Sequence, residues 1–367
     1  MRNEVLIVIP TFNEKENIAK LIKKIRDFKI DADILVVDDN SPDGTGKIAD
    51  QISKSDKGVF ILHRKEKTGL GRAYVAGFKW GIENGYKKLI SMDADFSHPV
   101  EALEKLINLC NSKTVVIGSR YTKGGKITGW KWPRYVNSWG ANLVTRTLLQ
   151  IKAKDATAGF KCYPVEFLKA INLDKIQASG YAFQVEMPLL AQDNGFRLVE
   201  TPITFADRIS GESKISGELM KSAKIVFKLA AGKKSYRQFV KFAIVGAINT
   251  VVDWAIFYPI SIVWLKSPGT LSAQSIKQIS KAISFIFAAA SSYFMNRAWT
   301  FRSKDKAIAK QAGKFFVVAL GGLIINQIAF YGATAILNWR SIFGLIAATA
   351  AATLWNFFLN KVWTFKN

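Results

Sequence analysis

The sequence predicts an α/β domain with a mostly parallel sheet, followed by a short linker and an all-α domain of four transmembrane helices. Up to about residue 206, apolar runs of strand length alternate with amphipathic segments, which is typical of a parallel sheet covered by helices. Beyond Arg237 come four long apolar stretches. We therefore expect an α/β domain at 1–216, interfacial helices at 217–236 and a membrane domain at 237–367.

The charge of the chain is strongly basic, with a formal net value of +24 over 367 residues. Much of the excess lies at 214–241 and 297–314, beside the apolar stretches. This pattern favours contact with an anionic membrane face over the binding of a nucleic acid.

The compartment of the α/β domain is expected to be the cytoplasm. The two cysteines, Cys110 and Cys162, are too few for a metal cluster and need not form a disulfide. The first apolar run, Val5 to Ile9, is stopped at once by Pro10, so it predicts a strand rather than a signal peptide.

Four apolar runs define the expected sheet, and they lie at 5–9, 34–37, 59–62 and 89–92. Acidic side chains follow the first, second and fourth runs: Glu14, then Asp38 and Asp39, then Asp93 and Asp95. The carboxyl ends of parallel strands meet at one edge, where α/β proteins bind their ligands. We therefore expect the functional site at this edge.

Asp93 and Asp95 carry the sharpest chemical signal. Two acids spaced i, i+2 at the end of a strand can both face one hard cation, and a divalent ion held by few protein oxygens completes its shell with substrate phosphates. The stretch thus predicts a metal that holds a diphosphate. The alternative is an acidic turn that caps a helix beginning near Val100.

Gly69 and Gly71 precede an expected helix that begins at Arg72 or Ala73. Glycines there let the backbone approach a ligand at a helix N-terminus. A plain turn is the alternative, and the spacing does not match the dinucleotide-binding fingerprint.

Several motifs, in their order and spacing, resemble family 2 glycosyltransferases of the GT-A fold. They are PTFNE at 10–14, VVDDNSPDGT at 36–45, KTGLGRA at 67–73, DAD at 93–95 and GSRY at 118–121. Four more narrow the resemblance to the polyprenyl-phosphate sugar synthases, most closely the dolichol-phosphate mannose synthases: WPRYVNSWGAN at 132–142, DATAGFK at 155–161, GYAFQVEM at 180–187 and RISGESK at 208–214. The resemblance covers about residues 4–216.

The resemblance implies a set of site residues. The guanosine of the donor would lie against Pro10, Phe12, Glu14, Val37 and Asp39. The metal, Mg²⁺ or Mn²⁺, and the diphosphate would be held by Asp93, Ala94 and Asp95. Further donor contacts would come from Lys67, Gly69, Gly71, Arg120, Arg208 and Lys214, the last three through phosphates of the donor or the acceptor.

Two positions depart from the family pattern. Ser97 stands where the family usually has a glutamine as an extra metal ligand, and its shorter side chain leaves room for an intervening water. Trp139 stands where relatives often have a second arginine, which leaves Arg134, with Ser138, as the candidate for the phosphate of the lipid acceptor.

The chemistry follows from these groups. A sugar leaves a nucleoside diphosphate readily when the developing charge is neutralised, which a cation at Asp93 and Asp95 can do together with Arg208 and Lys214. An acceptor phosphate is already mostly ionised near neutrality, so it needs positioning, by Arg134, rather than a general base. In-line attack inverts the anomeric centre.

Neither histidine is expected to act as a base. His63 and His98 have no partners in a triad-like arrangement, so we interpret both as structural. RISGESK is expected to be a loop that orders around phosphates, with a solvated basic turn as the alternative.

The linker and several tryptophans are candidates for membrane contact. Residues 217–229 place Lys221, Lys224 and Lys228 opposite an apolar face, which predicts a helix on the membrane surface rather than a core helix. The tryptophans at 130, 132 and 139 fit either an interfacial patch or the core.

The four expected spans are 239–265, 279–295, 315–337 and 342–359, and they contain a repeat. Gln238, Lys241, Phe242, Val245, Phe257 and Tyr258 recur 73 positions later, and Asn296, Trp299, Thr300 and Phe301 recur 64 positions later. Two helical hairpins are therefore duplicated. This part resembles the GtrA-like four-span domains that accompany such transferases. Basic residues beside the Trp-Thr-Phe corners predict that both termini are cytoplasmic.

Asp253 lies inside the first expected span, and its repeat partner is Asn326. An acid within a membrane span indicates a function. The alternative is a polar pair that joins the two hairpins.

The resemblance implies transfer of mannose from GDP-mannose to dolichyl (polyprenyl) phosphate at the cytoplasmic membrane face. One alternative is a polyprenyl-phosphate glucosyltransferase that uses UDP-glucose, and another is a lipid-sugar transporter with a degenerate transferase domain. A processive polysaccharide synthase would need a product-binding motif that the sequence lacks. Homo-oligomerisation, the preferred metal, the lipid length and movement of the lipid-linked sugar by the membrane domain stay open.

Overall fold

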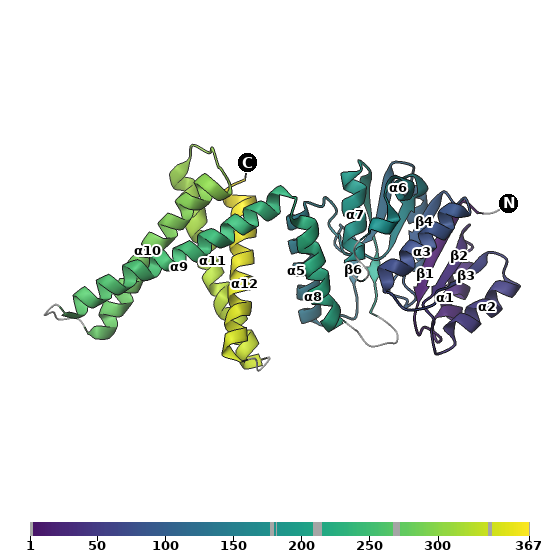
Figure 1. The fold of residues 1–367 in the computed structure, drawn as a ribbon, viewed down its shortest axis with the longest axis horizontal. Coiled ribbons are helices and arrows are strands. Elements are labelled where there is room, and N and C mark those ends of the chain that lie inside the picture. Colours follow the sequence, from purple (N-terminus) through teal and green to yellow (C-terminus); the bar gives the residue numbers. More distant parts are fainter. Residues whose placement is uncertain are drawn as a thin grey trace. The chain divides into compact units, whose positions relative to one another are not determined.

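The computed structural model describes residues 3–176, 180, 182–207, 215–266, 272–336 and 340–366. The chain divides into two compact units, Met1–Ala231 and Gly232–Asn367 (Figure 1). The boundary between the units falls inside the expected linker at 217–236.

A seven-stranded sheet of order β3-β2-β1-β4-β7-β5-β8 organises the first unit. Its strands are β1 (Val5–Thr11), β2 (Asp33–Asp38), β3 (Val59–His63), β4 (Lys88–Ser91), β5 (Thr114–Ser119), β7 (Lys161–Pro164) and β8 (Arg197–Pro202). Only β7, among these described strands, runs antiparallel to its neighbours β4 and β5, so the predicted mostly parallel sheet is confirmed. A small parallel pair, β6 (Lys126–Ile127) and β9 (Thr204–Phe205), lies apart from it.

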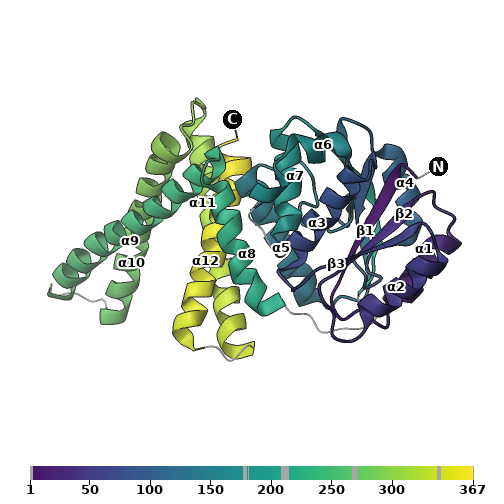
Figure 2. The same ribbon diagram turned by 45° about the vertical axis from the view of Figure 1, so that its right-hand side comes forward.

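Helices cover both faces of this sheet. The helices of this unit are α1 (Ile18–Asp27), α2 (Thr45–Ser55), α3 (Leu70–Glu83), α4 (Leu103–Leu109), α5 (Trp132–Leu149), α6 (Val165–Ala170), α7 (Phe183–Asp193) and α8 (Ile215–Ala230), with short 3₁₀ turns η1 (Val100–Ala102) and η2 (Leu173–Lys175). Figure 2 shows α1 and α2 on one side of the strands and α3 and α7 on the other. The helix expected near Val100 thus begins as a 3₁₀ turn and continues as α4.

The alternation of side chains along β1 explains the two cores. Ile7 and Ile9 belong to the apolar cluster that includes residues of α1, α2 and α4, whereas Leu6 and Val8 belong to the cluster with α3, α6 and α7. Because both faces are covered, the strand is a continuous apolar run. Glycine lets α3 lie close to the sheet, since a Cβ at Gly77 would be 2.4 Å from Cγ1 of Val8.

The second unit consists of two helical hairpins, as the repeat predicts. Helix α9 (Lys234–Lys266) packs along α10 (Ala273–Met295), and α11 (Ile308–Tyr331) packs along α12 (Ser341–Leu359). π-Helical turns follow three of these helices: η3 (Asn296–Thr300), η4 (Gly332–Ile336) and η5 (Asn360–Thr364).

Equivalent residues of the two repeats make equivalent contacts. Lys241 lies 5.2 Å from the ring centre of Trp299, and Lys314 lies 5.5 Å from that of Trp363. The phenylalanines of the two Trp-Thr-Phe corners, Phe301 and Phe365, stack on each other with ring centres 4.7 Å apart. The corners therefore form the common core of the two hairpins.

Within the described residues, three helices are long and apolar enough to cross a membrane: Lys234–Trp264, Ile308–Ala335 and Ser341–Thr364. The second of the four expected spans corresponds to α10, whose first turns carry Lys277 and Lys281. These charges lower the mean hydropathy of α10, so α10 is not among the helices that are long and apolar enough to cross a membrane.

Asp253 of α9 pairs with Lys281 of α10 and accepts a 2.7 Å hydrogen bond from the hydroxyl of Ser284. Both partners lie in the same hairpin as Asp253. The interpretation of Asp253 as a polar link between the two hairpins is therefore wrong, because these contacts join the two helices of the first hairpin.

Candidate active site

The loops that follow β1, β2 and β4 meet at one edge of the sheet. The register pairs Thr11 with Asp38 and Val8 with Ser91, so the three strands end close together. The backbone amide of Asp39 donates a 3.0 Å hydrogen bond to the carbonyl of Thr11. This is the edge at which the sequence predicts a ligand site.

The carboxylate of Asp93 is the accessible one of the acidic pair, with 30% of its side chain exposed. Its Oδ1 accepts a 2.8 Å hydrogen bond from the phenol of Tyr74, a buried residue of α3. Burial and the neighbouring Asp93 charge raise the pKa of Tyr74 well above its ordinary value, so the phenol keeps its proton and donates. Asp93 is thereby held with Oδ2 available.

Asp95 and Ser97 lie deeper. Both are buried, at 7% and 2% exposure, and Oδ1 of Asp95 accepts a 3.1 Å hydrogen bond from the backbone amide of Ser97. This short turn fixes the second carboxylate relative to the first.

His98 supports the same turn. Its Nδ1 accepts a 3.0 Å hydrogen bond from the amide of Asp93, and its ring stacks on Phe160 at 5.0 Å. Burial lowers the pKa of His98, although Asp93 and Asp95 oppose this, so the ring is neutral with its proton on Nε2. These contacts support the interpretation of His98 as structural. His63 lies elsewhere, with Nε2 at 3.0 Å from Oδ1 of Asp50.

The chemistry of this turn fits a hard divalent cation. Its donors are carboxylate oxygens with a nearby serine, the ligand type that Mg²⁺ and Mn²⁺ prefer. A Cβ at position 159 would lie 3.3 Å from Oδ2 of Asp93, so Gly159 leaves space beside the exposed oxygen. No cluster of three or more Asp, Glu, His or Cys side chains suited to a metal occurs among the described residues. An ion here would therefore take its remaining ligands from water and substrate.

The loops after β1 and β2 supply the other expected donor contacts. Lys67 lies 3.8 Å from the ring centre of Phe12. Asp39 pairs with Arg64, and burial raises the pKa of Asp39 although Arg64 opposes this. The structure thus gathers Phe12, Lys67 and Asp39 around one edge.

Pro10 and Val37 lie directly opposite each other in the register of β1 and β2, and both are buried. Glu14 is held by two contacts: its amide donates to the hydroxyl of Thr45 at 2.9 Å, and its Oε2 accepts from Nδ2 of Asn17 at 2.8 Å. These residues lie at the carboxyl ends of β1 and β2, on the side of the site expected to hold the nucleotide.

Gly69 precedes α3 with φ of +105°, a conformation that other residues rarely adopt. Gly71 lies buried in the first turn of the same helix. The backbone conformation therefore favours glycine at 69, which suits a plain turn and a ligand-binding loop alike.

Arg120 forms a buried ion pair beside the site. Its Nε and Nη2 donate to the two oxygens of buried Asp155, at 2.8 and 2.7 Å, and Nη2 also donates to the hydroxyl of Thr157 at 2.8 Å. Asp155 alone would have its pKa raised by burial, but the charge and hydrogen bonds of Arg120 keep it lowered. The guanidinium of Arg120 is thus held by Asp155, and its contact with a phosphate stays a prediction.

Helix α5 carries the two acceptor candidates on one face, because they are four residues apart. Arg134 donates to Oδ1 of Asp207 at 2.7 Å and lies 4.4 Å from the ring centre of Trp130. The hydroxyl of Ser138 lies 2.9 Å from that of Tyr121. Arg208 and Lys214 lie outside the described residues.

Lys161 is a buried residue that the sequence reasoning missed. Its ammonium donates to the carbonyl of Ala158 and, at 3.0 Å, to both the carbonyl and Oε1 of Gln184. Burial lowers the pKa of Lys161 to about 7, although Asp155 opposes this. The available signal was the DATAGFK motif, which begins with Asp155 and ends with Lys161, whereas Tyr74 gave no signal.

Comparison with known proteins agrees with this architecture. Residues 6–171 match the family described as glycosyl transferase family 2, and residues 241–365 match the family described as GtrA/DPMS, transmembrane domain.

Three relatives extend the comparison. An undecaprenyl-phosphate mannosyltransferase of Micrococcus luteus is 46% identical over 219 residues, which are 60% of this chain and 90% of that protein. A polyprenol monophosphomannose synthase of Mycolicibacterium smegmatis is 44% identical over 227 residues, 61% of this chain and 85% of that protein. A dolichol-phosphate mannosyltransferase of Pyrococcus furiosus is 32% identical over 335 residues, 89% of this chain and 90% of that protein. The chain therefore belongs to the family 2 glycosyltransferases, and it is a membrane protein with a GtrA/DPMS domain after the transferase domain.

Proposed function

We propose that this glycosyltransferase transfers mannose from GDP-mannose to a polyprenyl (dolichyl) phosphate, with inversion, giving polyprenyl phosphate mannose and GDP. The names of the three relatives support mannose as the sugar and a polyprenyl phosphate as the acceptor. GDP as the leaving group rests on the family resemblance of the loops after β1 and β2.

The observation that carries the proposal is the place of Asp93 and Asp95 in the sheet. Strand β4 lies between β1 and β7 in the order β2-β1-β4-β7-β5. The acidic turn thus lies between the loops assigned to the nucleotide, with Phe12 and Asp39, and the elements after β5, which lead to α5 and Arg134. A diphosphate at the turn would have its nucleoside on one side and its acceptor on the other.

The residues divide the work as follows. Asp93 and Asp95, with Ser97, would hold Mg²⁺ or Mn²⁺, and the bound ion supplies positive charge to the departing diphosphate. We assign Arg208 and Lys214 to the same phosphates. We assign Arg120 a supporting role, because its guanidinium is already bound to Asp155.

The acceptor side needs no base. We assign the lipid phosphate to Arg134 and Ser138, which would hold an oxygen of the phosphate in line with the bond between the sugar and the diphosphate. The phosphate is mostly ionised near neutrality, so it attacks directly.

The test is transfer by the full chain with each labelled donor and a polyprenyl phosphate. Mannose from GDP-mannose should enter the lipid fraction, and Asp95→Ala should lower the rate by about 100-fold or more. Asp27→Ala removes an exposed acid of α1 and should not change it. Incorporation of glucose from UDP-glucose without mannose would overturn the proposed sugar and donor. Lipid movement that persists in Asp95→Ala, with no transfer by the wild type, would favour a transporter.

We also propose four spans, with the transferase domain and both termini on the cytoplasmic side. At about 1.5 Å per residue, the 23-residue α10 is about 34 Å long, enough for a hydrocarbon core of about 30 Å. The charges at 297–314 lie after it, as the positive-inside rule expects for a cytoplasmic loop. A reporter that works only in the cytoplasm should be active when it is fused after the last residue. A reporter that works only outside the cytoplasm should be inactive at the same position.

A further inference from the structure

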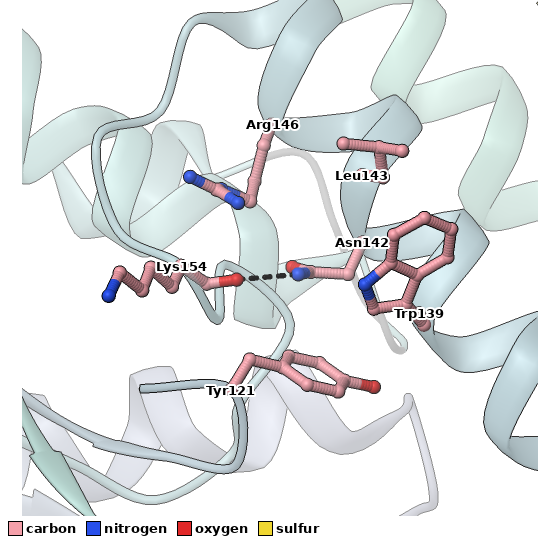
Figure 3. A pocket seen from close by; sticks show the side chains of 6 residues that line it. All are labelled: Tyr121, Trp139, Asn142, Leu143, Arg146 and Lys154. Atoms are coloured by element: carbon pink, nitrogen blue, oxygen red, sulfur yellow. Dashed lines mark hydrogen bonds between the residues drawn. The ribbon is translucent and has the colours of Figure 1, made fainter. Parts of the chain in front are cut away.

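A cavity of about 220 Å³ lies beside α5, and six residues line it: Tyr121, Trp139, Asn142, Leu143, Arg146 and Lys154 (Figure 3). Four of them come from α5, whereas Tyr121 follows β5 and Lys154 precedes β7. Tyr121 connects this cavity to Ser138, the acceptor candidate, whereas no function has been assigned to Arg146 or Lys154.

The cavity is divided into a cationic and an apolar half. In Figure 3 the nitrogen ends of Arg146 and Lys154 lie on one side, and Trp139 and Leu143 lie on the other. A ligand that fits must carry negative charge at one end and tolerate apolar contact at the other.

The cations of this cavity lack partners of opposite charge. Nε of Arg146 is buried without a hydrogen-bond partner, and within the described part of the chain neither Arg146 nor Lys154 pairs with a carboxylate. The neighbouring acid, Glu200, is occupied by the backbone amides of Lys154 and Asp155, at 2.8 and 2.9 Å. An anion would therefore give the buried Nε of Arg146 the partner that the protein does not supply, and the exposed ammonium of Lys154 would add positive charge beside it.

The polar side chain of Asn142, by contrast, is satisfied. Its Nδ2 donates to the carbonyl of Lys154 at 2.6 Å, and its Oδ1 accepts from the amide of Ala156 at 3.0 Å. Asn142 therefore forms part of the cavity wall and fixes the backbone of Lys154. The charged contacts to a ligand would come from Arg146 and Lys154.

An exposed aromatic stripe on α5 leads to the cavity. Trp132, Tyr135, Val136 and Trp139 follow the i, i+3, i+4, i+7 spacing of one helical face, with 76%, 44%, 49% and 48% exposure. Tryptophan and tyrosine with one apolar body and one polar group are typical of the membrane interface. Of the two interpretations of the tryptophans, the structure thus favours the interface for 132 and 139, while Trp130 packs against Phe205.

Size limits the ligand further. Sites for whole small molecules usually measure about 300–1,000 Å³, so 220 Å³ suits a headgroup rather than a nucleotide sugar. Arg146 lies 12 residues beyond Arg134, about 18 Å along the helix, so one phosphate cannot contact both.

We propose that the cavity binds the phosphate headgroup of a membrane lipid, with the aromatic stripe of α5 in the headgroup layer. Two lipids carry this chemistry at the membrane of this protein: an anionic phospholipid and a second molecule of polyprenyl phosphate. Its cationic end, at Arg146 and Lys154, is separate from the acceptor contact proposed at Arg134, whereas Tyr121 connects its wall to Ser138.

The test compares the double variant Arg146→Gln/Lys154→Gln with wild type and with a control, Lys152→Gln/Lys169→Gln, which removes two exposed cations of the same unit that do not line the cavity. Detergent-solubilised full chain is mixed with phosphatidylglycerol or polyprenyl phosphate, and retained lipid is measured by native mass spectrometry. Loss of two basic contacts should weaken retention of one lipid molecule by about 30-fold, and the control should retain it.

The two sources are distinguished by activity in nanodiscs. If the site takes phospholipid, phosphatidylglycerol raises wild-type turnover and the double variant loses only this increase. If it takes polyprenyl phosphate, the variant changes the dependence on acceptor concentration in neutral phosphatidylcholine. Equal retention of both lipids by variant and wild type overturns the proposal, whether or not mannose transfer is observed. Lys154→Gln alone changes an exposed residue and repeats the test if the double variant does not fold.

Discussion

The phenol of Tyr74 donates a 2.8 Å hydrogen bond to Oδ1 of Asp93 and so connects the core of α3 to the accessible carboxylate of the acidic turn. The ring of Tyr74 is fixed from the other side, because it stacks on Phe183 at 5.6 Å with an interplanar angle of 7°. A carboxylate that uses one oxygen in this way presents the other in a defined direction. Tyr74 is therefore a positioning residue for Asp93.

Tyr74→Phe is expected to raise the Mg²⁺ or Mn²⁺ concentration needed for half-maximal activity by about 10-fold, because partners that orient a metal ligand typically contribute 10–100-fold to metal affinity. At saturating metal the rate should largely recover. The measurement is the rate of transfer as a function of metal concentration.

Tyr86→Phe is the matched control, because the phenol of buried Tyr86 donates a 2.6 Å hydrogen bond to Asp33, at the opposite end of the sheet. It should cost similar stability and leave the metal dependence unchanged. An equal shift in both variants would show that Tyr74 acts through stability alone.

Removal of one partner of the buried Arg120–Asp155 ion pair should strongly destabilise the first unit. Asp155→Asn leaves a buried guanidinium without its counter-charge and is expected to cost about 3–5 kcal/mol. Asp174→Asn breaks an exposed pair with Lys79 and should cost less than about 1 kcal/mol. Heat denaturation of the full chain in detergent measures both, and equal losses would contradict the structural role of the buried pair.

The same pair makes a pH prediction. The pKa of Asp155 is lowered in the folded chain by Arg120, against the effect of burial, so its contribution is present above the unfolded pKa and is lost as the pH falls through the folded value. The wild type should therefore lose stability in acid more steeply than Asp155→Asn does.

Local patterns were sufficient to predict the sheet edge and its acids. Continuous apolar runs ended by Asp38 or Asp93 identify buried parallel strands and their carboxyl ends, and the repeated Trp-Thr-Phe corners identify two hairpins. Each strand end and each corner is defined by residues that are close together in the sequence. That is why the mostly parallel sheet and the paired helices could be predicted.

Features that depend on distant pairing could not be predicted. Strand β7 lies antiparallel between β4 and β5, and Asp155 reaches Arg120 across 35 positions in the sequence. Tyr74 has the helical spacing of an ordinary core residue, so only the folded sheet shows that its hydroxyl meets Asp93. The partner of Asp253 could not be predicted for the same reason, since Lys281 comes from a different helix.

Lys161 predicts an alkaline gain in stability. Its pKa is about 7 in the folded chain and about 10.4 in an unfolded one, so between these values the unfolded state binds the additional proton. The free energy of unfolding should rise with pH above 7, by up to about 1.4 kcal/mol per pH unit from this group, and be independent of it below 7. The difference between wild type and Lys161→Met in heat denaturation from pH 6 to 9 measures this, with the exposed Lys169→Met as control. Parallel curves for wild type and Lys161→Met would contradict the lowered pKa.

The pair of Asp253 and Lys281 separates a structural from a functional acid in the membrane unit. Asp253→Asn and Lys281→Gln should each destabilise the first hairpin, because each leaves one polar group without its partner. The double variant should recover part of the loss, with a coupling energy of about 0.5–2 kcal/mol in heat denaturation. Asn326→Ala, at the equivalent position of the second hairpin, should show no such coupling with Lys281→Gln. If the pair is only structural, the double variant also recovers glycosyl transfer and any movement of the product across the bilayer. A double variant that is stable but has lost either activity would show that Asp253 has a function beyond holding α9 to α10.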